Sequence, residues 1–210
     1  FGNIIFTGDL KVDHVGDQIP TPSEQTLFAS LGKEKNLLLL MDSTNARMPG
    51  WSHSERAVQE NLRMIIHDSP GRLIMGTFAS LLERVIYVIK ASEEMGKKVV
   101  ITGRSMKTNV EIARVLKYIT IKPGTLIDIA QINDYPKDKV VVVCTGAQGE
   151  ERASLMRIAN DEHRSVRIQP NDTVIFSSSV IPGNERTVQR LKDTLYRKGA
   201  RFTGPHTVLV

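Results

Sequence analysis

Thr7, Gly8 and Asp9 follow a short apolar run at the start of the chain, and they carry its most informative chemistry. A carboxylate at the end of a buried strand is held in a fixed direction, as a metal ligand must be, but one acid cannot hold a catalytic metal ion alone. No His-x-His or His-x-x-His pair occurs in the 210 residues, and the five histidines are scattered. Asp9 is therefore either an ordinary acid at a strand end or one ligand of a larger metal site.

Small and polar residues also follow the other apolar runs. In open α/β sheets, ligands bind beyond the carboxyl ends of the strands. Backbone amides in Gly-rich turns, with hydroxyls and an arginine nearby, suit phosphate oxygens. Ordinary turns and helix caps use the same residue types, so a structural role remains the alternative at each position. The candidate phosphate-binding residues are Ser43, Thr44, Ser80, Arg104, Ser105, Gly146 and Gln148.

The elements that position these residues form a βαβ pattern, in which short apolar runs alternate with stretches of helical period. The pattern predicts an α/β fold with a doubly wound, mostly parallel, Rossmann-like sheet flanked by helices. The high Val, Ile and Leu content predicts strands that are covered on both faces. The expected strands are 3–7, 37–41, 72–76, 98–102, 139–144 and 173–177, with a last run at 207–210.

Capping boxes and apolar stripes predict the helices. Ser52 with Glu55, and Thr108 with Glu111, have the spacing of capping boxes. A final helix is expected over 185–198. The predicted inward residues are Val58, Leu62, Ile65 and Ile66 in one helix, Leu81, Leu82, Val85, Ile86 and Ile89 in a second that ends before Gly96, and Val188, Leu191 and Leu195 in the last.

The composition is that of a folded protein, with 40% hydrophobic and 24% charged residues. No apolar stretch approaches the roughly 20 residues of a membrane span, and the start does not have the pattern of a signal peptide. The single cysteine, Cys144, ends a run of four valines and is expected to be a small buried hydrophobe. One cysteine excludes an internal disulfide, which favours a cytoplasmic location. The net charge of +5 favours a polyanionic partner only slightly.

Taken in order, the strand ends resemble the ribonuclease J family of metallo-β-lactamase nucleases, which carry an inserted β-CASP domain. The matching segments are FTGDLKVD (6–13), LMDSTNA (40–46), TFAS (77–80), GRSM (103–106), TGAQGE (145–150) and IPGNE (181–185). The resemblance covers the chain from its first residues to about position 200. It implies three segments: 1–50 as the end of the first metallo-β-lactamase segment, 51–205 as the β-CASP domain, and 206–210 as the start of the return to the metallo-β-lactamase domain.

The same resemblance implies a site with two metal ions, usually zinc, in the full-length parent. The family's Thr-Gly-Asp aspartate falls on Asp9, as a ligand that bridges the metals, and its first β-CASP acid falls on Asp42. Both would be catalytic. The family's histidine ligands and later histidine motifs have no match in this sequence. The chain alone is therefore expected to be inactive and to bind no zinc stably.

Ser80 and Arg84 also match residues near the RNA phosphate in the family. Glu83 stands where members often have a histidine, and Ala147 where they often have a serine. The implied function is metal-dependent hydrolysis of RNA phosphodiesters, endonucleolytic, with 5′-to-3′ exonuclease action left open. The partner is RNA, not a membrane, and the resemblance allows a homo-oligomeric parent without fixing its state.

Three alternatives stay open. The chain could be a non-catalytic module that binds RNA or another protein, or part of a DNA-directed β-CASP nuclease. An unrelated Rossmann-like nucleotide enzyme is the third. It is disfavoured because neither Gly-x-Gly-x-x-Gly nor Gly-x-x-x-x-Gly-Lys-Ser/Thr occurs in the sequence.

Overall fold

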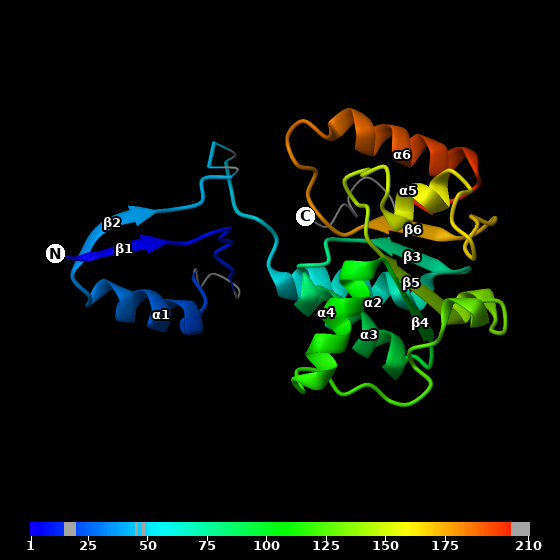
Figure 1. Cartoon of the computed structure of the whole chain (residues 1–210), viewed down its shortest axis with the longest axis horizontal. Helices are drawn as coiled ribbons and strands as arrows, with labels where there is room; N and C mark the ends of the chain where they lie inside the picture. The colour runs from blue at the N-terminus through cyan, green and yellow to red at the C-terminus, as the bar shows by residue number, and fades with distance from the viewer. Residues whose placement is uncertain (15–19, 45, 48, 203–210) are drawn as a thin grey trace. The chain divides into compact units, whose positions relative to one another are not determined.

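A computed structural model of the protein describes residues 1–14, 20–44, 46–47 and 49–202. The chain divides into two compact units, Phe1–Val58 and Gln59–Val210, here called the first and second units. Each unit has its own parallel sheet (Figure 1). The strand expected at 207–210 and the segment 206–210 lie outside the described residues.

The first unit contains two parallel strands, β1 (Asn3–Phe6) and β2 (Asn36–Leu40), joined through helix α1 (Pro22–Gly32). Helix α1 was not predicted from the sequence, although Thr21 and Glu24 form a capping box at its start. All five residues of β2 are exposed, and Leu37 is 70% exposed. The prediction that the strands are covered on both faces is therefore wrong for this pair, because the described residues of this unit leave its apolar side chains uncovered.

The second unit contains five parallel strands in the order β4-β5-β3-β6-β7. This arrangement confirms the predicted α/β class, and the four longer strands lie within one residue of their predicted bounds. The short β7 was not predicted. The strands are β3 (Leu73–Gly76), β4 (Lys98–Thr102), β5 (Val140–Cys144), β6 (Thr173–Phe176) and β7 (Arg201–Phe202).

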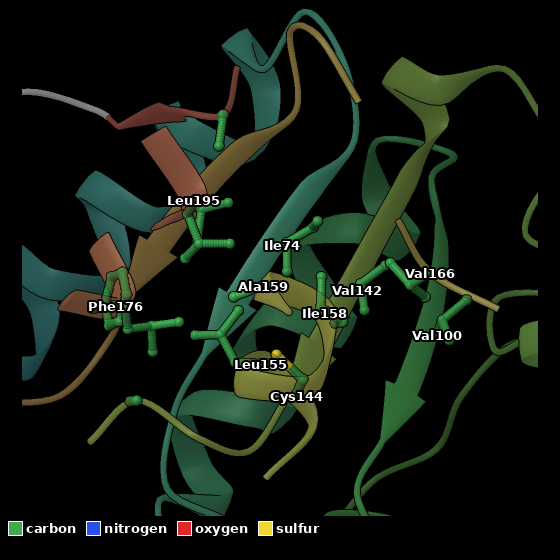
Figure 2. Packing of buried hydrophobic residues seen from close by; sticks show 14 of the residues in the cluster. Ile74, Val100, Val142, Cys144, Leu155, Ile158, Ala159, Val166, Phe176 and Leu195 are labelled. Atoms are coloured by element: carbon green, nitrogen blue, oxygen red, sulfur yellow. The ribbon is translucent and has the colours of Figure 1, made fainter. Parts of the chain in front are cut away.

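Helices cover both faces of this sheet (Figure 1). One face carries α2 (Glu55–Asp68), α3 (Leu82–Glu94) and α4 (Arg104–Val115), and the other carries α5 (Ser154–Ala159) and α6 (Glu185–Arg197). Successive strand residues point to opposite faces, so Ile74 and Val142 pack with Leu155, Ile158 and Leu195 in one cluster on the α5 and α6 side (Figure 2). Two short 3-10 turns, η1 (Ile129–Gln131) and η2 (Lys137–Lys139), precede β5.

Two predicted helix starts are wrong. α4 begins at Arg104, so Thr108 lies inside the helix and does not cap it. α2 begins at Glu55, where the hydroxyl of Ser54, not that of Ser52, accepts the N–H of Ala57 at 3.2 Å. The apolar stripe of α2 is buried as predicted. α5 was not predicted.

A buried ion pair lies near the amino ends of β3 and β6. Arg72 Nε and Nη2 donate to the two carboxylate oxygens of Asp172 at 3.0 and 2.6 Å, and these side chains are 3% and 0% exposed. Asp172 Oδ2 also accepts the N–H of Gln169 at 2.8 Å. No helix in the described part of the chain is long and apolar enough to cross a membrane.

Candidate functional site

Asp9 and Asp42 lie on the loops that follow β1 and β2. These strands are parallel neighbours, so their carboxyl ends meet at one edge of the sheet. Asp42 connects the two loops: its Oδ2 accepts the N–H of Leu10 at 3.2 Å, and its Oδ1 accepts the N–H of Thr44 at 2.8 Å. Its own N–H donates to Thr7 Oγ1 at 3.2 Å.

The hydrogen bonds to Asp42 favour its ionised form. The pKa of this carboxyl is lowered, first by the backbone N–H of Thr44 and also by that of Leu10. Asp42 is half-buried, and both of its carboxylate oxygens accept backbone donors. The geometry therefore assigns this acid to holding the loop that carries Asp9.

Asp9 is the exposed carboxylate of this edge. It follows Gly8, whose φ of +62° suits glycine, and its side chain makes no hydrogen bond or ion pair with another described residue. Among the described residues, no group of three or more His, Cys, Asp or Glu side chains could hold a metal ion. These residues thus supply one open carboxylate, and their donor set does not fit a zinc site by itself.

The carboxyl ends of β3, β5 and β6 form a second group of loops, in the second unit. Thr77 joins all three strands, because its N–H donates to the carbonyl of Cys144 at 3.0 Å and its hydroxyl donates to that of Ser177 at 3.0 Å. Arg84 reaches the same place from α3, where Nη1 donates to Ser177 O at 3.1 Å and lies 3.3 Å from Ser177 Oγ. Arg84 is 5% exposed, so its guanidinium belongs to the interior of this edge.

Gln148 joins the loop after β5 to the loop after β6. The side chain is 3% exposed. Its Nε2 donates to Ser179 O at 2.6 Å and to Ser178 Oγ at 3.2 Å, while its Oε1 accepts the N–H of Ile181 at 2.8 Å. Gly146 turns the same loop toward α5 with a φ of +112°, and a Cβ there would lie 2.8 Å from Ala153 Cβ. Gln148 and Gly146 thus shape the edge from within.

Ser80, Arg104 and Ser105 are exposed at this edge. Asn109 ties their two segments together, because its Nδ2 donates to the carbonyl of Ala79 at 2.7 Å. Ser43 and Thr44 are exposed in the first unit, beside Asp42, whereas Asn45 lies outside the described residues. The predicted phosphate-binding residues therefore divide into an exposed group and a buried group that contains Arg84, Gly146 and Gln148.

A buried polar cluster at the end of β4 was not predicted from the sequence. His163, 7% exposed, accepts the N–H groups of Ser165 and Val166 at Nδ1, at 3.3 and 3.2 Å. The neutral ring therefore carries its hydrogen on Nε2, which donates to Thr102 Oγ1 at 3.2 Å. Burial first, and then the charges of nearby arginines, lower the pKa of His163. Thr102 and His163 are 61 residues apart in the sequence, so no local sequence pattern indicates this cluster.

Cys144 is fully buried, as predicted, and its Sγ lies 3.4 Å from the carbonyl oxygen of Met75. Burial raises the pKa of the thiol to about 12. A thiol this basic stays protonated at neutral pH, so Cys144 behaves as a core side chain and not as a nucleophile.

A family model described as ribonuclease J, beta-CASP domain, matches residues 70–195. The chain belongs to this family. The match of the ribonuclease J β-CASP model begins just before β3 and ends within α6, so it covers four of the five strands of the second unit.

Curated relatives resemble the β-CASP chain over nearly its whole length. It is 42% identical over 200 residues to ribonuclease J 1 of Streptococcus pyogenes serotype M3, covering 94% of this chain and 35% of the relative. It is 40% identical over 214 residues to ribonuclease J of Thermus thermophilus, covering 100% and 36%. For ribonuclease J of Helicobacter pylori the identity is 39% over 201 residues, covering 95% and 29%. The chain thus spans about a third of the length of these relatives.

Proposed function

We propose that this chain is part of a longer ribonuclease J-type enzyme that hydrolyses RNA phosphodiesters with the help of two zinc ions. The observation that carries the proposal is the edge formed by β1 and β2. There Asp42 holds the loop after β1, and the exposed carboxylate of Asp9 has no partner among the described residues. In this proposal, residues 1–50 belong to a metallo-β-lactamase domain and residues 51–205 to the β-CASP domain. The uncovered apolar strands of the first unit support a larger sheet in the longer protein.

Asp9 is proposed to provide one carboxylate ligand to the zinc ions. The remaining ligands are assigned to the rest of the longer protein, because the described residues supply too few donors. Zinc, when bound, supplies the Lewis acidity for phosphodiester hydrolysis. Asp42 acts on this site through the loop, as a positioning residue.

The exposed group at the two edges is proposed to contact RNA phosphates: Ser43, Thr44, Ser80, Arg104 and Ser105. Hydroxyls and a guanidinium are suitable donors to phosphate oxygens. The buried group, Arg84, Gly146 and Gln148, is proposed to hold these loops in place without direct contact. The chain alone would then contribute RNA contacts but no catalysis, in a cytoplasmic enzyme.

The test uses the full-length protein that carries this chain and a single-stranded RNA with a 5′-monophosphate. We expect zinc-dependent cleavage of RNA that exceeds cleavage of DNA of the same sequence. Asp9→Asn should lose both bound zinc and cleavage while it keeps the wild-type circular dichroism spectrum. Asp134→Asn is the control, because Asp134 is an exposed acid outside the site. This variant should keep both the bound zinc and the cleavage of RNA.

Each contrary result points to a named alternative. Faster cleavage of DNA would favour a DNA-directed nuclease. RNA binding without cleavage, in the full-length protein loaded with zinc, would favour a non-catalytic RNA-binding module. Full activity in Asp9→Asn would refute the role of Asp9 as a ligand.

A further inference from the structure

Basic side chains gather at the amino ends of β6 and β7. Segments 157–167 and 197–201 contain six cationic side chains and two acidic ones, an excess of four, whereas the whole chain carries a net charge of +5. We call these cations the amino-edge basic surface: Arg157, Arg164, Arg167, Arg197, Lys198 and Arg201. The charge is thus concentrated on two short segments that are far apart in the sequence.

Asp161 brings the two segments together. Lys198, which follows α6, forms an ion pair with Asp161 Oδ2, and Arg167 Nη1 lies 3.7 Å from Asp161 Oδ1. Arg157 donates from Nη2 to the carbonyl of Glu162 at 3.3 Å. The loop that follows α5 and the end of α6 therefore form one continuous surface. Asp161 is the acid that interacts with two of the cations of this surface, Arg167 and Lys198.

The buried Arg72–Asp172 pair lies beneath this surface and fixes its backbone. Arg72 Nη2 donates to the carbonyl of Arg167 at 2.5 Å, while the N–H of Arg201 donates to the carbonyl of Asp172 at 2.8 Å. Arg167 and Arg201 are thus attached to the same buried pair from two strand-linked segments. Ordered backbone under exposed cations lowers the entropy lost when a ligand binds.

Several of these charges are not compensated by the described residues. Arg164, Arg197 and Arg201 are exposed, and their side chains make no hydrogen bond or ion pair within the part of the chain that the structure describes. Five of the six cations are arginines. The planar guanidinium matches the geometry of phosphate oxygens and can donate two hydrogen bonds to them.

The surface is separate from the candidate site of the second unit. Ser80, Arg104 and Ser105 lie beyond the carboxyl ends of the parallel strands, whereas the basic surface lies at the amino ends. The four residues of β6 alone separate the two edges by about 13 Å, at about 3.3 Å per residue. One phosphate cannot touch both edges, so a ligand that used both would be an extended polyanion.

We propose that the amino-edge basic surface binds the phosphate backbone of single-stranded RNA, as a second contact outside the candidate site. The choice of RNA among polyanions rests on the proposed function. A positive surface that follows the backbone binds single strands without sequence preference, and its affinity falls with salt because bound counterions are released.

The experiment measures RNA binding by the full-length protein over a range of salt concentrations, with a long single-stranded RNA labelled by a fluorophore. The triple variant Arg164→Gln, Arg197→Gln, Arg201→Gln removes three charges without removing a contact among the described residues. If all three contact phosphates, the slope of log affinity against log salt should become shallower by about 2, at about 0.7 per phosphate contact. Cleavage of a short RNA at saturating concentration should not change.

The matched control is Lys117→Gln, Lys122→Gln, Lys137→Gln, which removes the same charge from exposed lysines on the β4 and β5 side of the sheet. We expect this variant to keep most of the wild-type slope. An equal change in both triple variants would mean a general charge effect and would overturn the inference. An unchanged slope in the arginine variant would also overturn it.

Two further outcomes separate this inference from the proposed function. A full-length protein that binds RNA through the surface but never cleaves it would refute the proposed function and leave the inference standing. Normal cleavage with an unchanged slope would refute the inference alone. Binding to phosphatidylserine vesicles that the arginine variant loses, with RNA binding intact, would assign the surface to a membrane and overturn the choice of RNA.

Discussion

Asp42 accepts the backbone N–H of Leu10 through Oδ2, at 3.2 Å, across 32 residues of sequence. The bond joins the end of β2 to the residue that directly follows Asp9. A second bond, from the N–H of Thr44 to Oδ1, fixes the orientation of the same carboxylate. The direction in which Asp9 leaves its loop therefore depends on an acid of the neighbouring strand.

Replacing Asp42 should reduce turnover in the full-length enzyme. Asp42→Ala removes the acceptor of both N–H groups and frees the loop that carries Asp9. Loss of such a supporting partner costs about 10- to 100-fold in metal affinity or activity. We expect a fall in kcat for RNA cleavage, with KM for RNA nearly unchanged, in steady-state kinetics.

Asp42→Asn is the matched variant, because its amide oxygen can still accept one of the two N–H groups. It should recover part of the kcat that Asp42→Ala loses. Equal zinc content and equal kcat in wild type and Asp42→Ala would show that Asp42 does not position Asp9.

Replacing Arg104 should change RNA binding, whereas replacing Arg84 should change stability. Arg104 is exposed at the start of α4, so Arg104→Gln should leave stability unchanged and make the salt slope of RNA binding shallower by about 0.7. Arg84 is buried on Ser177, so Arg84→Gln should lower the free energy of unfolding by about 1.5–3 kcal/mol, as for hydrogen bonds of charged groups. Urea unfolding and salt-dependent RNA binding measure the two effects. A stability loss in Arg104→Gln, or none in Arg84→Gln, would contradict this division.

The strands of the second unit could be predicted from the sequence because buried parallel strands appear as continuous apolar runs. Helix α1 was missed because its apolar pattern is short: only Leu27, Phe28 and Leu31 are large and apolar, and no residue of the helix is buried among those described. Its remaining signal was the capping box of Thr21 and Glu24. Two-residue β7 is too short to produce a pattern.

The sequence predicts which residues of the site follow the strands, but not which side chains they contact. Adjacent parallel strands place Asp9 and Asp42 on neighbouring loops, which the sequence pattern indicates. The partners of Arg84 and Gln148 are set by tertiary packing, since Arg84 meets Ser177 across 93 residues and Gln148 meets Ile181 across 33. Local residue type therefore does not distinguish a side chain that holds the loops from one that is free for a ligand.

The buried pair of Arg72 and Asp172 should be essential for the stability of the second unit. Asp172→Asn leaves the guanidinium of Arg72 buried without its counter-charge, which costs about 3–5 kcal/mol when one partner of a buried pair is removed. The free energy of unfolding from urea titration measures this. Glu94→Gln is the control, because it removes the carboxylate of the exposed Arg63–Glu94 pair and should change little. A loss in Asp172→Asn no larger than in the control would refute the prediction.

His163 should make the stability of the chain depend on pH. Burial first, and then Arg157 and Arg167, lower its folded pKa below the ordinary 6.5, so below that pH the unfolded chain binds more protons than the folded one. The contribution of the neutral ring is therefore fully present above pH 6.5 and is lost as the pH falls through the folded pKa. The free energy of unfolding, measured from pH 8 to about pH 5, should fall toward acid in the wild type.

His163→Gln removes this titration and should flatten that part of the pH profile, whatever its stability at neutral pH. His67→Gln serves as the comparison variant, since it removes a histidine whose side chain is 74% exposed, and the slope of His163→Gln is compared with its slope. The tautomer provides an independent measurement, because Nδ1 accepts the N–H groups of Ser165 and Val166 and so must be unprotonated at neutral pH. Nitrogen chemical shifts should place the hydrogen on Nε2. An identical pH slope in wild type and His163→Gln would show that protonation of this ring does not limit stability.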